Sequence, residues 1–124
     1  MKTKKTIGLL CCLSATLLSA PSWAGGDARK GADVFAEECG DCHSAIAGKN
    51  KKGPTLNGIF GRKAGSAEGF KYSDGMAKSG ITWDDASLDK WLTDTKAVVP
   101  GNKMTFALKD PKQREDVIAY LKTQ

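Results

Sequence analysis

The sequence predicts a small all-α domain in which several helices and long loops surround a bound group. Apolar residues recur at spacings of three and four in several segments, and no segment alternates convincingly as a strand. A glycine-rich stretch, residues 44–69, separates the first helical segment from the others. Long loops inside a compact domain usually enclose a ligand or carry a functional site. We therefore expect helices and loops packed around a ligand.

The first 24 residues have the features of a secretory signal peptide. A start with three lysines is followed by an apolar run, Ile7–Ala20, and by a small residue, Ala24, at a small-x-small cleavage site. The run has 14 residues, fewer than the roughly 18 of a membrane span. We expect residues 1–24 to be cleaved as the signal peptide and residues 25–124 to form one domain. An uncleaved anchor is the alternative.

The small net charge of the mature domain argues against nucleic acid as a partner. Removal of the leader takes away three lysines and no acid, so that Lys and Arg fall from 19 to 16 against 14 Asp and Glu. The formal net charge then falls from +5 to +2. A strong basic patch for nucleic acid is not supported by this balance.

The first helix is expected from Asp27 to about Glu38, where Val34, Phe35 and Cys39 lie near one face at a period of about 3.6. The glycines and Pro54 that follow it are typical of tight turns. This part of the chain is therefore expected to be a long loop region.

Three further helices are indicated by their capping residues. Ser73 can cap a short helix that runs through Lys78. Asp84 or Asp85 can cap another that runs to about Asp94.

The last helix has the clearest start. After the loop that begins at Val98–Gly101, Asp110 can serve as the cap and Pro111 as the first helical residue. The helix then carries Val117 and Leu121 at helical spacing.

The pentapeptide Cys39–His43 reads C-x-x-C-H, the attachment signature of a c-type haem. Thiols three residues apart on one helical turn can add to the two vinyl groups of a haem and form thioethers. His43 then lies under the ring and can ligate the iron. It is the only histidine of the chain. The sequence thus predicts one haem c per subunit, attached through Cys39 and Cys42.

Two other interpretations of this motif are weaker. A thioredoxin-like redox pair needs a βαβ pattern around its cysteines, and the sequence shows none. A structural zinc site needs four ligands, whereas Cys39, Cys42 and His43 give three and no further Cys or His follows.

The second axial ligand decides between an electron carrier and a protein that binds small molecules at an open iron position. Only Met76 and Met104 remain after removal of the leader. Met76 falls inside a short predicted helix, where methionine commonly packs as core filler. Met104 follows a Pro-Gly turn in a loop without helical period. The context favours Met104 and leaves Met76 as the alternative.

The motifs together resemble the mitochondrial-type class I cytochrome c family, in its bacterial periplasmic branch. The matching stretches occur in the family's order and cover nearly all of the mature chain: Cys39–His43, Gly53–Leu56, Gly58–Arg62, Phe70–Ser73, Gly80–Trp83, Pro100–Phe106 and Arg114–Leu121. The combination of C-x-x-C-H, a following Gly-Pro and a late Pro-Gly-x-Lys-Met is highly specific. The resemblance implies a small cytochrome c fold around one covalently attached haem.

The resemblance also implies roles for individual residues. Met104 would be the distal iron ligand, and the carbonyl oxygen of Pro54 would accept a hydrogen bond from Nδ1–H of His43. Gly31 and Phe35 on the first helix would pack against the last helix.

Three further residues, Arg62, Tyr72 and Trp83, would lie near the haem propionates and donate hydrogen bonds to them. The alternatives are that Arg62 is a solvated surface charge and that the two aromatic residues are ordinary core residues with satisfied polar tips. Pro54 could likewise be a simple turn residue.

The chain departs from the mitochondrial pattern at three positions near the distal side. Trp91 stands where tyrosine is frequent, and its indole can donate but not accept a hydrogen bond. Met76 replaces a polar residue, and Asn102 stands where threonine is common. The hydrogen bonding around Met104 is therefore expected to differ in this chain.

The function expected from these residues is that of a soluble periplasmic electron carrier with one His/Met-ligated haem, and not an enzyme. Its partners would be redox proteins, such as membrane complexes, reductases or oxidases, in transient contact. We expect a monomer with no nucleic-acid partner and no stable membrane insertion. The alternatives are an enzyme or gas-binding haem protein with Met104 detached, and a haem-free interaction module.

Overall fold

The computed structural model describes residues 25–124, so the predicted signal peptide lies outside the described residues. Within this part of the chain the secondary structure is helical, apart from one isolated antiparallel bridge between Lys63 and Thr82. The helices are α1 (Ala28–Val34), its continuation η1 (Phe35–Cys39), α2 (Asp74–Ala77), α3 (Asp85–Thr93), α4 (Thr95–Val98) and α5 (Pro111–Leu121). The predicted all-α class is confirmed.

The first helix is confirmed, with a change of winding that the sequence did not predict. Asp27 caps α1 by accepting hydrogen bonds from the backbone N–H groups of Arg29 and Lys30. From Phe35 the chain winds as a π-helix, and the N–H of Gly40 donates to the carbonyl of Phe35 at 2.7 Å. Such turns are rare and are found frequently at functional sites. Here the π turn ends on Cys39, the first residue of the attachment motif.

The predicted caps of the later helices are also confirmed. The hydroxyl of Ser73 accepts from the backbone N–H of Met76 and so caps α2. Asp84 and Ser87 form a capping box at the start of α3. Asp110 caps α5, with Pro111 at its first position. Each side chain satisfies a backbone donor that has no partner inside its helix.

Helix α4 is not predicted by the sequence pattern. Asp94, expected to end the preceding helix, also caps this new one by accepting from the N–H groups of Lys96 and Ala97 at 3.0 and 3.1 Å. A helix of four residues is too short to show an apolar period. Its formation depends on the cap and on contacts outside the helix.

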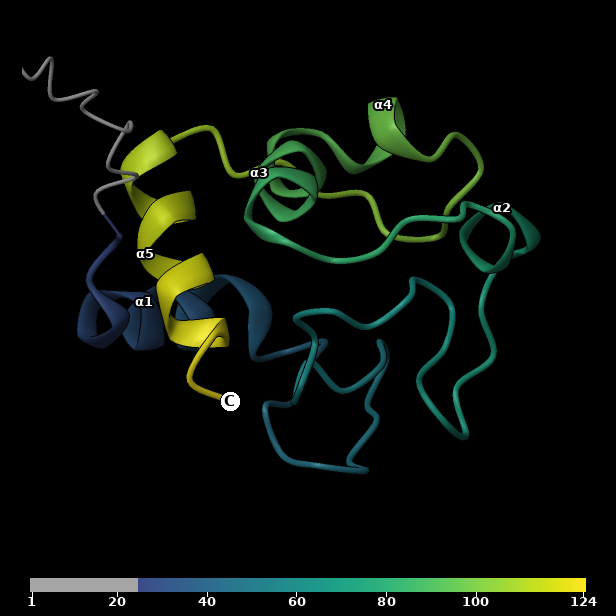
Figure 1. Ribbon diagram of the computed structural model, residues 1–124, viewed down its shortest axis with the longest axis horizontal. Helices are drawn as coiled ribbons and strands as arrows, with labels where there is room; N and C mark the ends of the chain where they lie inside the picture. The colour runs from purple at the N-terminus through teal and green to yellow at the C-terminus, as the bar shows by residue number, and fades with distance from the viewer. Residues whose placement is uncertain (1–24) are drawn as a thin grey trace, which may run out of the picture.

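Helices α1 and α5 cross in close contact at one end of the molecule (Figure 1). A Cβ atom on Gly31 would lie 1.9 Å from the carbonyl oxygen of Asp116, so only glycine permits this approach. One turn further on, the rings of Phe35 and Tyr120 meet with centroids 5.3 Å apart. The expected packing of Gly31 and Phe35 against the last helix is confirmed.

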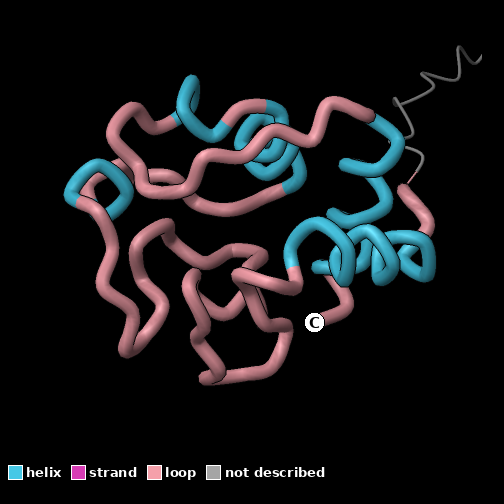
Figure 2. Tube along the Cα trace, turned by 180° about the vertical axis from the view of Figure 1, so that it is seen from behind, coloured by secondary structure: helices cyan, strands magenta, loops and turns pink. Residues whose placement is uncertain are grey.

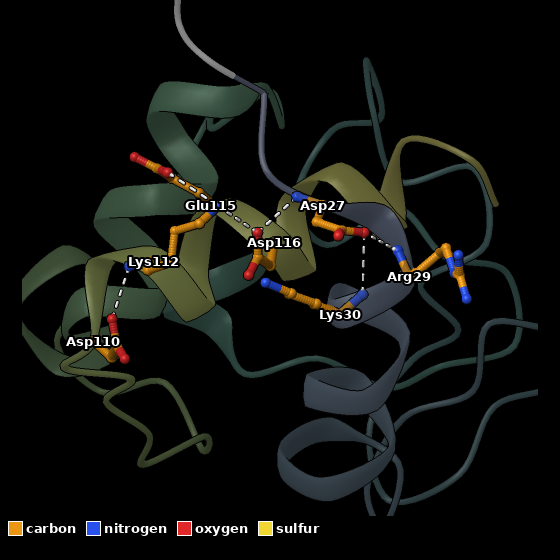
Figure 3. Close-up of polar contacts among 7 residues, drawn as sticks. All are labelled: Asp27, Arg29, Lys30, Asp110, Lys112, Glu115 and Asp116. Atoms are coloured by element: carbon orange, nitrogen blue, oxygen red, sulfur yellow. Dashed lines mark hydrogen bonds and ion pairs between the residues drawn. The ribbon is translucent and has the colours of Figure 1, made fainter.

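A buried carboxylate ties the start of α1 to α5 (Figure 3). The side chain of Asp116 is almost fully buried, and it accepts hydrogen bonds from the N–H of Asp27 at 2.6 Å and from Nζ of Lys112 at 2.7 Å. These bonds, above all the one from Lys112, hold the pKa of the Asp116 carboxyl below its usual value.

The remainder of the fold is mostly loop, which runs from the end of η1 to α2 and from α4 to α5 (Figure 2). Buried polar groups hold the first of these loops. The N–H of Leu56 donates to the carbonyl of Ser44 at 2.8 Å, and the buried hydroxyl of Thr55 donates to the carbonyl of Ile46 at 2.7 Å. The loop therefore has a defined path without a sheet or a helix.

Replacement of Gly31 by alanine should lower the free energy of unfolding by about 1–3 kcal/mol or more, because the added methyl group forces α1 and α5 apart. Denaturant unfolding of the purified protein measures this change. Gly25→Ala is the control, since a Cβ there meets no atom within 4 Å. Equal stability of the two variants would contradict the described crossing.

The stability contributed by the Asp116 carboxylate should depend on pH. Since its folded-state pKa is depressed, the contribution is complete above the unfolded value of about 3.8 and is lost as pH falls through the lower folded pKa. Asp116→Asn should therefore flatten the acid limb of a plot of stability against pH. The asparagine oxygen can still accept from the N–H of Asp27, so an unchanged acid limb would show that the ion pair with Lys112 contributes little.

Candidate functional site

A cavity of about 290 Å³ lies between the helices and the loops. Its lining is predominantly apolar, with contributions from α2, α3, α5 and the long loops. All eight site residues expected from the sequence contribute to it: Cys39, Cys42, His43, Pro54, Arg62, Tyr72, Trp83 and Met104. The fold thus brings together residues that are spread over most of the domain.

His43 is held in one orientation. Its Nδ1 lies 2.8 Å from the carbonyl oxygen of Pro54. A carbonyl oxygen can only accept, so Nδ1 carries the proton and Nε2 keeps its lone pair. The N–H of Gly53 donates to the carbonyl of Cys42 at 2.8 Å, and this bond fixes the loop beside the histidine. The imidazole is therefore preset as a nitrogen ligand through Nε2.

Gly53 also packs directly against this ring. A Cβ at this position would lie 2.3 Å from Cε1 and 2.7 Å from Nδ1 of His43. The sequence pattern indicates only a turn at Gly53 and does not predict this contact. Its only sequence signal is its position immediately before Pro54. The absence of a side chain is what lets the loop reach the histidine.

Burial lowers the pKa of His43, and the nearby positive charge of Lys51 acts in the same direction. The hydrogen bond to the Pro54 carbonyl opposes this shift without cancelling it. The neutral imidazole, which is the form that binds a metal, is therefore favoured at neutral pH.

The two cysteines of the C-x-x-C-H motif line the cavity, Cys39 buried and Cys42 exposed. Burial, together with the nearby charges of Glu38 and Cys42, raises the pKa of the Cys39 thiol to about 11. Reactive cysteines of redox enzymes have a depressed pKa instead. This environment disfavours the thioredoxin-like interpretation.

A short antiparallel contact places Arg62 beside Trp83. The N–H of Gly61 donates to the carbonyl of Trp83 at 2.8 Å, and the N–H of Trp83 donates to the carbonyl of Arg62 at 3.0 Å. The Arg62 guanidinium donates to the carbonyls of Thr55 at 2.7 Å and Asn57 at 3.0 Å. Its position at the cavity wall is therefore fixed, and it is not a freely solvated charge.

The aromatic residues of the lining are packed in pairs. The hydroxyl oxygen of Tyr72 accepts from the N–H of Ala67 at 3.1 Å, so its own proton remains available to donate. The rings of Phe70 and Tyr72 meet edge to face with centroids 4.9 Å apart, and those of Trp83 and Trp91 with centroids 5.6 Å apart. These rings give the cavity broad apolar walls.

Both methionines of the described chain line the cavity. Met76 projects from α2 and is buried within the hydrophobic core, as expected for a packing residue. Met104 is half-buried and lies in the loop between α4 and α5. Because both methionines line the cavity, this observation does not decide which of them could be the iron ligand.

The donor set and the mostly apolar lining of the cavity fit a haem. A flat apolar ring can occupy a space walled by aromatic and aliphatic side chains. Thiols lie at Cys39 and Cys42, an oriented imidazole at His43 and thioether sulfurs at the two methionines. These are the ligand types of c-type haem proteins.

The sequence model of the family described as Cytochrome c matches residues 28–124. The chain belongs to this family. Its members carry covalently attached haem c, and Cys39 and Cys42 have the spacing of the attachment motif.

Individual relatives agree with this assignment. The chain is 49% identical to cytochrome c2 of Rhodomicrobium vannielii over 122 residues, which is 97% of each chain. It is 59% identical to cytochrome c2 iso-2 of Magnetospirillum fulvum over 86 residues, or 68% of this chain and 90% of the relative. Among solved structures, cytochrome cH from Methylobacterium extorquens matches with a TM-score of 0.74 and 50% identity, covering 80% of this chain and all of that one.

These findings confirm the cytochrome c fold and establish the general function. The chain is a single-haem electron carrier of the class I c-type cytochromes, and its relatives are carriers and not enzymes. None of the helices in residues 25–124 combines the length and the apolar character needed to cross a membrane.

Replacement of Gly53 by alanine should disturb the histidine more than replacement of its neighbour Pro54. The new methyl group would overlap the imidazole, whereas Pro54→Ala retains the backbone carbonyl that orients it. We expect Gly53→Ala to lower the yield of haem-loaded protein and to shift its visible spectrum, and Pro54→Ala to change both much less. Spectra and haem content of the purified variants measure the difference. Similar behaviour of the two variants would contradict the described contact.

Proposed function

We propose that Cys39 and Cys42 hold the haem through thioether bonds and that His43 and Met104 supply its two axial ligands. The observation that carries this proposal is the convergence of these four residues on one apolar cavity. His43 would bind through Nε2, because its Nδ1 proton is engaged by the Pro54 carbonyl. This hydrogen bond also makes the imidazole a better donor.

Met104 is the proposed sulfur ligand rather than Met76. Met76 is buried and belongs to the hydrophobic core, and it sits on a capped helical turn whose position is fixed by packing. Met104 lies in the irregular segment between α4 and α5 and is half-buried against the edge of the core. A loop residue can be placed against a ligand without disturbing the core.

Arg62, Tyr72 and Trp83 are proposed to surround the haem propionates. Each lines the cavity and carries at least one N–H or O–H group. Carboxylates inside a protein are costly unless they receive hydrogen bonds. The fixed Arg62 guanidinium supplies a positive charge there, which compensates part of this cost.

The haem supplies reversible one-electron chemistry when it is bound. His43 and Met104 would stay in place in both oxidation states, so that little rearrangement accompanies the gain or loss of an electron. Thioether ligation and burial both raise the reduction potential. Cys42 lines the cavity and is exposed, and we place the route of the electron near it.

We further propose that the mature carrier is a soluble monomer in the periplasm, formed by cleavage after Ala24. The sequence supports a signal peptide at residues 1–24. The similarity to Rhodomicrobium cytochrome c2 extends over 122 residues and therefore reaches into this leader. Its partners would be redox proteins, such as membrane complexes, reductases or oxidases, in brief contact.

Met104→Ala should remove the weak far-red absorption band that accompanies methionine–iron ligation in the ferric protein. It should also lower the reduction potential and let carbon monoxide bind rapidly to the reduced protein. Met76→Ala is the control and should retain the band, with a loss of stability of about 2–5 kcal/mol from the cavity it leaves. Spectra in both redox states and a redox titration measure these properties.

Loss of the band in Met76→Ala alone would assign the ligand to Met76. Rapid binding of carbon monoxide by the unsubstituted protein at neutral pH would favour the alternative of a haem protein with an open iron position.

A further inference from the structure

Two almost fully buried polar side chains converge on the backbone of Met104. Thr95 is 0% exposed and Asn102 is 3% exposed. Thr95 is the first residue of α4, and Asn102 follows in the loop that carries Met104. Buried polar groups need partners, and nearly all the partners of these two lie in the loop that carries Met104.

The peptide groups on both sides of Met104 are bonded by these side chains. Oδ1 of Asn102 accepts from the N–H of Met104 at 2.7 Å. The hydroxyl of Thr95 donates to the carbonyl of Met104 at 2.6 Å and accepts from the N–H of Phe106 at 3.2 Å. The residue is thus fixed from its N-terminal and its C-terminal side.

The two side chains are themselves linked through α4. Nδ2 of Asn102 donates to the carbonyl of Thr95 at 2.8 Å and to that of Val99 at 2.7 Å. In addition, Nζ of Lys96 donates to the carbonyl of Asn102. Since Asp94 caps α4, the cap, the helix and the loop form one hydrogen-bonded unit.

We propose that Thr95 and Asn102 are positioning residues that keep the Met104 side chain directed at the haem iron. This inference rests on the proposed role of Met104 as axial ligand. Release of that ligand requires the loop to move, and movement breaks the three bonds to the backbone of residues 104–106. The unit formed by Thr95 and Asn102 therefore slows the access of other ligands to the iron.

The test is the rate at which imidazole binds to the ferric holoprotein, because imidazole can enter only when the native sulfur ligand leaves. Thr95→Val preserves the shape of the side chain but leaves the Met104 carbonyl and the Phe106 N–H without their partner. Loss of such a buried bond corresponds to about a tenfold change in an equilibrium constant. We expect Thr95→Val to accelerate imidazole binding by about tenfold or more.

Two matched variants separate positioning from general stability. Thr95→Ser keeps the hydroxyl and should bind imidazole at nearly the original rate. Thr93→Val makes the same change of side chain on the exposed surface of α3 and should also leave the rate unchanged. Hydrogen exchange should accelerate at the amides of Met104 and Phe106 in Thr95→Val and stay unchanged in α1, which packs on α5 and not on this loop.

A second variant covers the case in which Thr95→Val does not fold. Asn102→Ala removes the acceptor of the Met104 N–H and should likewise accelerate imidazole binding and local exchange. Equal rates in Thr95→Val, Asn102→Ala and Thr93→Val would overturn the inference.

Met104→Ala distinguishes the two proposals. If it opens the iron to imidazole while the Thr95 and Asn102 variants match the control, only the positioning inference fails. If it leaves imidazole binding and the far-red band unchanged, the ligand assignment itself fails.

Discussion

The close crossing of α1 and α5 is the constraint on which the rest of the structure depends. Gly31 lets the two helices approach until its Cα faces the backbone of Asp116. The buried Asp116 carboxylate accepts a hydrogen bond from the N–H of Asp27 and so holds the N-terminal end of α1 in place. Because η1 continues α1 directly, this crossing also determines where Cys39 and His43 lie. The apolar residues of α5, among them Val117 and Leu121, then form one wall of the cavity.

Apart from the residues of α2 and α3, the rest of the lining comes from segments with little regular structure. Backbone hydrogen bonds and buried polar side chains set their paths, as at Thr55 in the first loop and Thr95 in the last. Loops of this kind lack a core of their own, so they depend on what they enclose. A covalently bound haem would supply apolar surface on both faces and hold them together. The fold and the cofactor are in this sense parts of one packing arrangement.

Much of this arrangement could be predicted from the sequence, because the relevant signals are local. Capping residues such as Ser73, Asp84 and Asp110 give the starts of three helices, and the C-x-x-C-H motif gives the centre of the site. The eight expected site residues line one cavity, although their roles remain a proposal. The sequence could not give the π turn of η1 or the single turn of α4. Both depend on hydrogen bonds made in the folded chain, and neither is long enough to leave a period.

The contact between Gly53 and His43 has a consequence for how such a site can change over time. With 2.3 Å between a hypothetical Cβ and the ring, no side chain can be accepted at position 53 while the imidazole keeps its place. The two positions are therefore epistatic: a mutation at one is tolerable only after compensation at the other. A redesign that replaces His43 therefore has to vary Gly53 at the same time.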